Sequence, residues 1–598
     1  MTFWMGLVAV FLAAVLPFIR AFSYGIVNLD DYWYVAMHDP IIAGLGMDGI
    51  KFAFTSLDEA IWMPLTWISY MIDHSLFGAG NWGAFHAHSI LLHGLNAVLL
   101  YLLLRRIVGF TVGGRARALD FICAVAAMIW ACHPLRCESA VFIASRKDVL
   151  SLFFESLAML LWFKDGHRYY WASIVSFTLA GMAKPSVMTF PLLCFLVDFF
   201  IRRSARLIRY ALPLAMAAAL GWFAGFAQTA GGATEDVFGS PFWYKLVNAA
   251  TSFGLYLWNT VWPLDLAAEY LIRWPEWPRL CILGIPICVV VCVWLARRLW
   301  RLKERFSDEV EVVWHGLSPE WKLRGEAEPV FAGLMWFALA IAPMLGIVGF
   351  GLHSMADRFT YIPSIGLSIA IAAFLASRVR PEKTFAIHYC LLPVVAALAA
   401  MTWRQTGFWK DDFTLFSRTL EVDGDRNALA HGLLANWYFE FPHDLKKCTD
   451  HYERMVELCP RLAETYFLAY AFALCESKRE KEMPDQLKAF DKWVHEKIEE
   501  NPRLGKNSSR AKFTRNIYHL ARVAYLITQP DLRKVAAEMI DAATCPQDDS
   551  TILYLKWRLA LAEGGEAEAE PARRAILEKG KTKSYVQFRY LRNTEIHK

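Results

Sequence analysis

The chain has 598 residues, of which 56% are hydrophobic and 20% are charged, and its formal net charge is +5. A positive charge this small for the length gives no reason to expect nucleic acid as a partner. The twelve cysteines are scattered, with no C-x-x-C pair and no zinc spacing, so the sequence establishes neither a disulfide nor a structural zinc site.

The apolar residues are unevenly distributed along the chain. Nearly all of the long apolar runs lie before Trp403, and the sequence after that point is more charged. This shift predicts two domains, a membrane domain over residues 1–403 and a soluble domain over residues 404–598. The first run, residues 3–22, lacks a basic leading segment and a clear cleavage site, so we expect it to remain as the first membrane helix.

Further apolar runs predict a polytopic, all-α helix bundle. A spanning helix needs about 20 mostly apolar residues. About eleven spans are expected on this basis, over residues 3–22, 87–105, 119–133, 148–164, 170–184, 187–201, 209–228, 279–297, 329–349, 361–378 and 385–402. Residues 243–262 are also apolar enough, but counting them would place the next basic loop on the wrong side. Their Trp and Tyr content favours an interfacial or re-entrant helix.

Basic residues cluster after alternate spans, which orients the bundle. They follow the second, fourth, sixth, eighth and tenth spans, within residues 105–117, 164–168, 202–209, 297–305 and 378–383. Since cytoplasmic loops carry the excess of Lys and Arg, these loops are expected inside the cell. The opposite loops, and after an odd number of spans the C-terminal domain, then face outward. We expect a bacterial inner-membrane protein with a periplasmic C-terminal domain.

Polar residues gather in the outer loops, close to the ends of the spans. They occur in residues 23–86, 133–148, 184–185 and 353–361. Charges so near a membrane are costly unless they are paired or functional. Four such groups on one side predict a shared polar pocket at the outer surface.

Two adjacent acids, Asp30 and Asp31, follow the first span on the outer side. A partly desolvated carboxylate is a stronger base than one in water, which suits a general base. The alternative interpretation is a helix N-cap with a solvated neighbour.

Five cations lie on the same predicted side and suit a phosphate, because guanidinium and ammonium donors match its oxygens. They are Arg136, Arg146, Lys147, Lys184 and Arg358. The alternative is anchoring at the membrane interface. A divalent metal held by His133, Glu138, His353 and Asp357 is a further alternative, although the spacing of these residues is not diagnostic.

The soluble domain has a helical pattern with few strand signals. Residues 427–460 carry Cys448, Tyr452 and Pro460 near the offsets of a tetratricopeptide repeat, but Asn436 stands where that repeat usually has Gly. Pro502 would close a second, more divergent unit. Stacked repeats would offer a concave surface to a partner; the alternative is an ordinary helical domain.

Six short blocks occur in a particular order: NLDDYWYV (28–35), WMPLTW (62–67), HPLRCE (133–138), SRKD (145–148), AKP (183–185) and MADRFTY (355–361). In this order they resemble the membrane core of the transmembrane-and-tetratricopeptide-repeat proteins. That family is similar to protein O-mannosyltransferases and belongs to the GT-C glycosyltransferases. The resemblance covers roughly residues 1–403, with the repeat domain in the expected place.

The resemblance implies a GT-C fold and an inverting enzyme. Such enzymes transfer a sugar from a polyprenyl-phosphate donor to an acceptor hydroxyl, of a protein or a glycan, on the outer side. Related mannosyltransferases carry Asp-Glu in the first outer loop and favour the first acid, so Asp30 is the expected base and Asp31 the second choice. The substrate-binding residues expected from the blocks are Trp62, His133, Arg136, Glu138, Arg146, Lys147, Lys184, Asp357, Arg358 and Tyr361.

Two other classes of protein remain open. A transporter or lipid flippase would carry charged residues deep inside spans and broken helices. A membrane scaffold would bind partners through its repeats and would not need ordered charges in the outer loops. Transfer of sugar from a polyprenyl-phosphate donor would separate these classes.

Overall fold

The structure, a computed structural model, divides into two compact units, Met1–Thr414 and Leu415–Lys598. It describes residues 3–36, 38–57, 60–111, 116–230, 240–273, 276–278, 280–315, 318–323, 327–347, 353–378, 384–441, 444–459, 462–477, 479–488, 522–542, 549–565, 567–571 and 574. The domain boundary predicted after residue 403 falls inside helix α16 (Thr384–Phe408).

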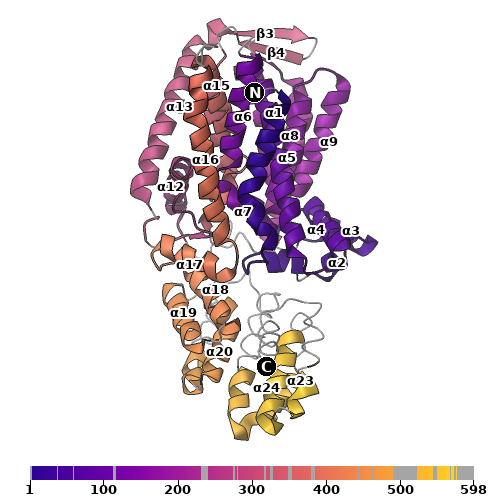
Figure 1. Ribbon diagram of the computed structural model, residues 1–598, viewed down its shortest axis with the longest axis vertical. Helices are drawn as coiled ribbons and strands as arrows, with labels where there is room; N and C mark the ends of the chain where they lie inside the picture. Colours follow the sequence, from indigo (N-terminus) through magenta and orange to yellow (C-terminus); the bar gives the residue numbers. More distant parts are fainter. Residues whose placement is uncertain are drawn as a thin grey trace. The chain divides into compact units, whose positions relative to one another are not determined.

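Long helices make up most of the first unit, and most of them run side by side (Figure 1). Besides α16 they are α1 (Phe3–Val15), α5 (Trp82–Gly109), α6 (Ala116–Ala131), α8 (Arg146–Trp162), α9 (His167–Ala183), α11 (Ile208–Ala230), α12 (Phe242–Val261), α13 (Cys281–Glu309), α14 (Pro329–Ile341) and α15 (Ser364–Arg378). The shorter α10 (Phe190–Leu196) lies between the turns η6 (Pro185–Thr189) and η7 (Val197–Ile201). Leu, Ala and Met are frequent in these helices and favour the helical state.

Within the described part of the chain, four helices are long and apolar enough to cross a membrane: Phe3–Ser23, Trp82–Gly109, Ile208–Thr229 and Cys281–Arg301. A fifth would be the pair Leu119–Ala131 and Pro134–Val141, which is bent by 61°. Large apolar side chains on α13 are exposed, with Ile282 at 90% and Val290 at 67%. Such a surface is typical of a membrane protein. Each predicted span coincides with helical structure, but the number of spans stays a prediction.

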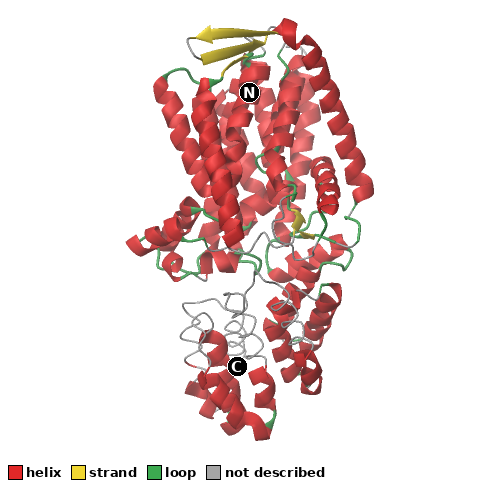
Figure 2. Ribbon diagram, turned by 180° about the vertical axis from the view of Figure 1, so that it is seen from behind, coloured by secondary structure: helices red, strands yellow, loops and turns green. Residues whose placement is uncertain are grey.

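Helix α12, predicted as an interfacial or re-entrant segment, packs against α13 at a close backbone crossing. A Cβ atom added to Gly254 would lie 1.8 Å from the carbonyl oxygen of Gly284, so neither position tolerates a side chain. Small residues at such crossings let two helices approach closely within a membrane. In Figures 1 and 2 α12 is foreshortened beside the long α13, so it runs across the direction of α13. Its placement relative to a membrane stays a prediction.

In the described ranges, two small antiparallel sheets accompany the helices (Figure 2). One has the order β1-β4-β3, from Ser204–Arg206, Ser318–Leu323 and Val310–His315, and the other pairs β2 (Tyr270–Leu271) with β5 (His353–Met355). Apolar and polar residues alternate in part along residues 310–323, which favours a hairpin. The fold is therefore mostly helical, as predicted, with these strands as a local departure.

Short elements form the end of the first unit opposite the β3–β4 hairpin (Figure 1). They are η1 (Leu16–Ser23), η2 (Tyr32–Ala36), α2 (Asp39–Ile42), α3 (Met47–Thr55), α4 (Pro64–Phe77), η4 (Pro134–Arg136), α7 (Cys137–Val141), η5 (Ile143–Ser145), η8 (Ala342–Met344) and η9 (Asp357–Thr360). Most of the predicted outer-loop residues lie in these elements or next to them.

The second unit is helical where it is described. Its elements are α17 (Asp412–Asp423), which starts in the first unit, α18 (Ala428–Glu440), α19 (Leu445–Leu458), α20 (Ala463–Glu476), η12 (Glu480–Glu482), η14 (Pro530–Leu532), α23 (Arg533–Ala542) and α24 (Asp549–Gly564). Asn427 caps α18 by accepting the N–H of Ala430 at 3.0 Å. The Tyr452 hydroxyl donates to Asn436 and so joins α19 to α18. The tetratricopeptide likeness stays a prediction, and Pro502 lies outside the described residues.

Candidate functional site

The first outer loop is fixed by Asp31. This residue is 1% exposed, and its carboxylate accepts the backbone N–H groups of Val27 at 3.2 Å and Ala144 at 2.8 Å. Burial raises the pKa of Asp31 to about 8, although the two backbone donors act in the opposite direction. Asp31 therefore ties the first outer loop to the second.

The neighbouring Asp30 has a different environment. It is half-buried, and no hydrogen bond to its carboxylate is found within the described ranges. Its charge interacts with three cationic or titratable side chains from distant parts of the chain, Lys147, His353 and Arg358. The structure thus brings an acid of the first loop near cations of the second and last loops.

A third carboxylate, Asp412, lies near the C-terminal end of the first unit and fixes the same loop. Its Oδ1 accepts the backbone N–H of Asn28 at 2.7 Å. Burial raises the pKa of Asp412 to about 7. The loop that carries Asp30 is therefore held by Asp31 within it and by Asp412 at the start of α17.

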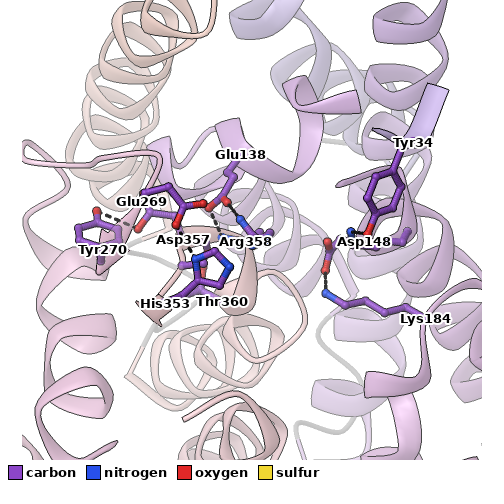
Figure 3. Close-up of polar contacts among 12 residues, drawn as sticks. Tyr34, Glu138, Asp148, Lys184, Glu269, Tyr270, His353, Asp357, Arg358 and Thr360 are labelled. Atoms are coloured by element: carbon purple, nitrogen blue, oxygen red, sulfur yellow. Dashed lines mark hydrogen bonds and ion pairs between the residues drawn. The ribbon is translucent and has the colours of Figure 1, made fainter. Parts of the chain in front are cut away.

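Two lysines lie at the start of α8 and after α9. Lys147 Nζ donates to the Tyr34 hydroxyl at 3.0 Å and lies 4.2 Å from the centre of the Tyr34 ring. Lys184 Nζ pairs with Asp148 Oδ1 at 2.5 Å (Figure 3). A cavity of about 20 Å³, roughly the size of one water molecule, is lined by Asp148, Lys184, Ser186, Ala340, Met344, Arg358, Phe359, Ile362 and Pro363. Lys184 and Arg358 thus share a small polar gap.

The last outer loop adds a group of paired charges (Figure 3). Glu138 accepts the backbone N–H of Arg358 at 2.8 Å and also pairs with its guanidinium. The Tyr270 hydroxyl donates to Asp357 Oδ1 at 3.3 Å. Burial raises the pKa of Asp357, and the Glu138 carboxylate adds to this rise. Glu138 therefore orients Arg358 through both its main chain and its side chain.

Arg146 pairs with Asp73, away from the charges around Glu138 and Arg358. It is fully buried, and its guanidinium donates to Asp73 at 2.5 Å, Ser89 at 2.9 Å and the carbonyl of Phe85 at 2.7 Å. These partners use its N–H groups within the protein core. Arg146 therefore helps to pack α8 against α4 and α5, and phosphate binding by this residue stays a prediction.

Four other residues that were predicted to bind substrate form hydrogen bonds to other parts of the protein. Arg136 donates to the Thr360 carbonyl at 3.2 Å, and Tyr361 is buried with its hydroxyl 2.7 Å from His93 Nδ1. His133 Nε2 lies 2.9 Å from the Thr260 carbonyl oxygen. Trp62 Nε1 donates to the Phe54 carbonyl at 3.1 Å. These contacts support the loops around Asp30 and Arg358 but leave a direct substrate contact of these side chains a prediction.

Three of the four predicted metal ligands, Glu138, His353 and Asp357, lie in the same charged group (Figure 3). Across the described residues, no three His, Cys, Asp or Glu side chains are arranged to hold a metal ion. His133 and Glu138 instead bond to Thr260 and Arg358. A metal requirement therefore stays open as a question for biochemistry.

Sequence reasoning missed Glu269, which pairs with His353 in the same group. Glu269 is an acid in an otherwise mostly apolar stretch, and this position could have marked it as a candidate site residue. It also missed Asp412, which follows Asp411 at the start of the soluble helices and resembles an ordinary helix cap.

The chain is similar to Protein O-mannosyl-transferase F38B6.6 of Caenorhabditis elegans, at 20% identity over 375 residues. The match covers 60% of this chain and 48% of the relative, so the chain spans about half the length of that protein. No known family profile matches the chain, and no solved structure does.

Proposed function

We propose that this protein is a membrane glycosyltransferase of the inverting GT-C type, which moves a sugar from a polyprenyl-phosphate donor to an acceptor hydroxyl. One observation carries the proposal: the half-buried Asp30 lies within electrostatic reach of Lys147 and Arg358, which come from distant loops. The distant similarity to a protein named as an O-mannosyl-transferase supports it.

The two adjacent acids suit different roles in this reaction. Asp30 has a carboxylate without a recorded hydrogen-bond donor in the described part of the chain, so it can accept the proton of an acceptor hydroxyl. Asp31 already accepts two backbone N–H groups and serves to position the loop. As the hydroxyl oxygen bonds to the anomeric carbon, the bond from that carbon to the phosphate oxygen breaks, through an oxocarbenium-like transition state.

The leaving phosphate gains negative charge, and fixed cations in a water-poor site stabilise it. Lys184 and Arg358 already pair with Asp148 and Glu138. The recorded hydrogen bond of Lys147 goes to a neutral phenol instead. We therefore propose Lys147 as the main phosphate contact, with Lys184 and Arg358 completing the positive side of the pocket.

The remaining parts of the proposal concern placement and partners. The basic loops predict that the pocket faces the extracytoplasmic side, in a bacterial cell the periplasm, together with the C-terminal unit. The helical repeats would hold a protein or glycan acceptor. The donor's lipid tail would lie between apolar helices at the membrane level.

A transporter is the second candidate, and one observation favours it. Glu155 is 1% exposed within α8, and neither of its carboxylate oxygens has a hydrogen-bond partner among the residues that the structure describes. Ionisable residues inside membrane helices often mark ion or substrate paths. A transporter would move substrate across a bilayer without chemical change, which a transfer assay distinguishes.

The test is sugar transfer by the purified full-length protein with a panel of polyprenyl-phosphate hexoses and hydroxyl-bearing peptides or glycans. We expect transfer by the wild type and by Asp165→Asn, an exposed carboxylate on the opposite side. Asp30→Asn should lose transfer and keep its thermal midpoint. No transfer with any donor would overturn the proposal, and full activity of Asp30→Asn would remove Asp30 from the mechanism.

A further inference from the structure

Glu269 and His353 form a carboxylate–imidazole pair that the mechanism above does not use. Glu269 immediately precedes β2, and His353 is the first residue of β5. The two strands pair antiparallel, with Leu271 opposite His353. A hydrogen bond joins Glu269 Oε2 to His353 Nδ1 across the strands (Figure 3).

The surrounding structure fixes the position of β5. The Ser354 hydroxyl donates to the Tyr270 carbonyl at 2.9 Å. On the other side, Asn248 and Ser252 of α12 donate to the Ser354 carbonyl at 3.3 and 3.0 Å. The imidazole is therefore presented by a strand that β2 and α12 hold in place.

The second imidazole nitrogen is open. Nδ1 is bound to Glu269, whereas no partner for Nε2 is found among the described residues. The Glu269 side chain is 3% exposed and the His353 side chain is 27% exposed. A carboxylate on one nitrogen fixes the tautomer and orientation of the ring and leaves the other nitrogen as a donor.

The charged groups near His353 are Glu269, Arg358 and Asp30. Burial lowers the pKa of His353, but the Glu269 carboxylate raises it by more, so the net shift is upward. Arg358 acts against this rise, and Asp30 adds to it. An imidazolium is thus favoured at a position that shares Asp30 and Arg358 with the proposed reaction site.

We propose that Glu269 and His353 form a catalytic dyad, in which the Nε2–H of His353 donates to a non-bridging oxygen of the donor phosphate as it leaves. This inference rests on the proposed function. The acceptor hydroxyl gives its proton to Asp30, its oxygen bonds to the anomeric carbon, and the electron pair of the breaking bond goes to the phosphate. The dyad contributes a charge-assisted hydrogen bond and neither gains nor loses a proton.

The dyad makes transfer sensitive to alkaline pH. When pH rises through the pKa of His353, the imidazolium loses its charge and the phosphate loses one charged donor. Glu269→Gln removes the group that raises this pKa, so the loss of activity should begin at lower pH. His353→Gln should remove this alkaline limb and lower kcat/KM for the donor about tenfold to a hundredfold.

A purely structural pair would behave differently, and His88 provides a matched control. His88 Nδ1 bonds to Asp73 Oδ1 at 2.6 Å, with side chains 30% and 1% exposed, so its environment resembles that of His353. We expect His88→Gln to leave the pH profile of transfer unchanged.

The experiment measures kcat/KM for the polyprenyl-phosphate donor from pH 5 to 10, with thermal midpoints of all variants. An alkaline limb that is the same in Glu269→Gln as in the wild type would overturn the dyad while leaving the glycosyltransferase intact. Absence of transfer by the wild type would instead overturn the proposed function, and the dyad with it. If His353→Gln does not fold, the shift of the alkaline limb in Glu269→Gln tests the dyad.

Discussion

Asp30 and Asp31 are neighbours in sequence with the same side chain, yet their surroundings differ. Asp31 is buried and accepts two backbone N–H groups, whereas Asp30 is half-buried among cations. A buried acceptor stabilises the fold, and a carboxylate without donors remains free for chemistry. The structure therefore distinguishes the surroundings of two acids that the sequence could only rank.

We expect the asparagine variants of these two acids to differ in stability. In Asp31→Asn the amide NH₂ group faces one of two backbone donors, which should cost about 1–3 kcal/mol for the unsatisfied N–H. Asp30→Asn lacks this cost. Thermal unfolding in the same detergent measures both variants, and equal midpoints would contradict the positioning role of Asp31.

Arg146 and Lys147 form a second pair of neighbours with different predicted effects. Arg146→Met leaves Asp73 buried without its cation, which should cost about 3–5 kcal/mol. Lys147→Met removes a hydrogen bond to a phenol and one cation near Asp30, so its effect should fall on kcat/KM for the donor. Thermal melting curves and donor kinetics should be measured for both variants. An Arg146→Met protein as stable as the wild type would contradict the role of Arg146 in packing α8.

The sequence could identify Lys147, Lys184 and Arg358 as one group because they lie in outer loops of one predicted side. It could not separate Arg146 from them. That distinction depends on Asp73, which lies far from Arg146 in sequence and meets it only when α4 packs near α8. Long-range pairing of this kind leaves no local pattern in the chain.

At the scale of elements, helix α17 reaches back to the first outer loop. Its first residue, Asp412, accepts the N–H of Asn28. Hydropathy predicts where the apolar helices lie, but not this contact, because a carboxylate at a helix start resembles any N-cap. The side-chain contact of Glu269 with His353 was missed for a similar reason, since it depends on the pairing of β5 with β2, which has only two residues. The hairpin of β3 and β4, by contrast, could be predicted in part, because apolar and polar residues alternate along part of its sequence.

The raised pKa of Asp412 predicts a pH-dependent stability. Its folded-state pKa is about 7, above its ordinary value of 3.8, so the folded protein holds a proton that the unfolded chain releases between these values. The stabilisation from this group is therefore present at low pH and is lost as pH rises toward 7. We expect the difference in thermal midpoint between wild type and Asp412→Asn to change in this direction. A difference that does not vary with pH would contradict the assignment.

At the scale of the whole molecule, the composition change near Trp403 predicted a membrane domain and a soluble domain. The structure divides into two compact units after Thr414, and the character of each domain stays a prediction. Apolar runs predicted the helices because a run long enough for a membrane is also a strong helical pattern. The side of the membrane rests on loop charge alone.

Labelling from outside the cell tests the predicted orientation. Arg301 lies at the basic end of α13, and Glu421 is exposed on α17. In a chain whose exposed Cys292 is replaced by Ser, an impermeant maleimide should modify Glu421→Cys in intact cells. Arg301→Cys should react only after permeabilisation. Labelling of both positions in intact cells would refute the orientation.

The bond between Asn28 and Asp412 joins residues 384 positions apart. The ribosome must therefore add more than four hundred residues before the loop carrying Asp30 can acquire its final anchor. Until then, of the two carboxylates that hold this loop, only Asp31 is present in the growing chain. The final anchoring of the loop therefore belongs to the last stage of synthesis of the membrane part.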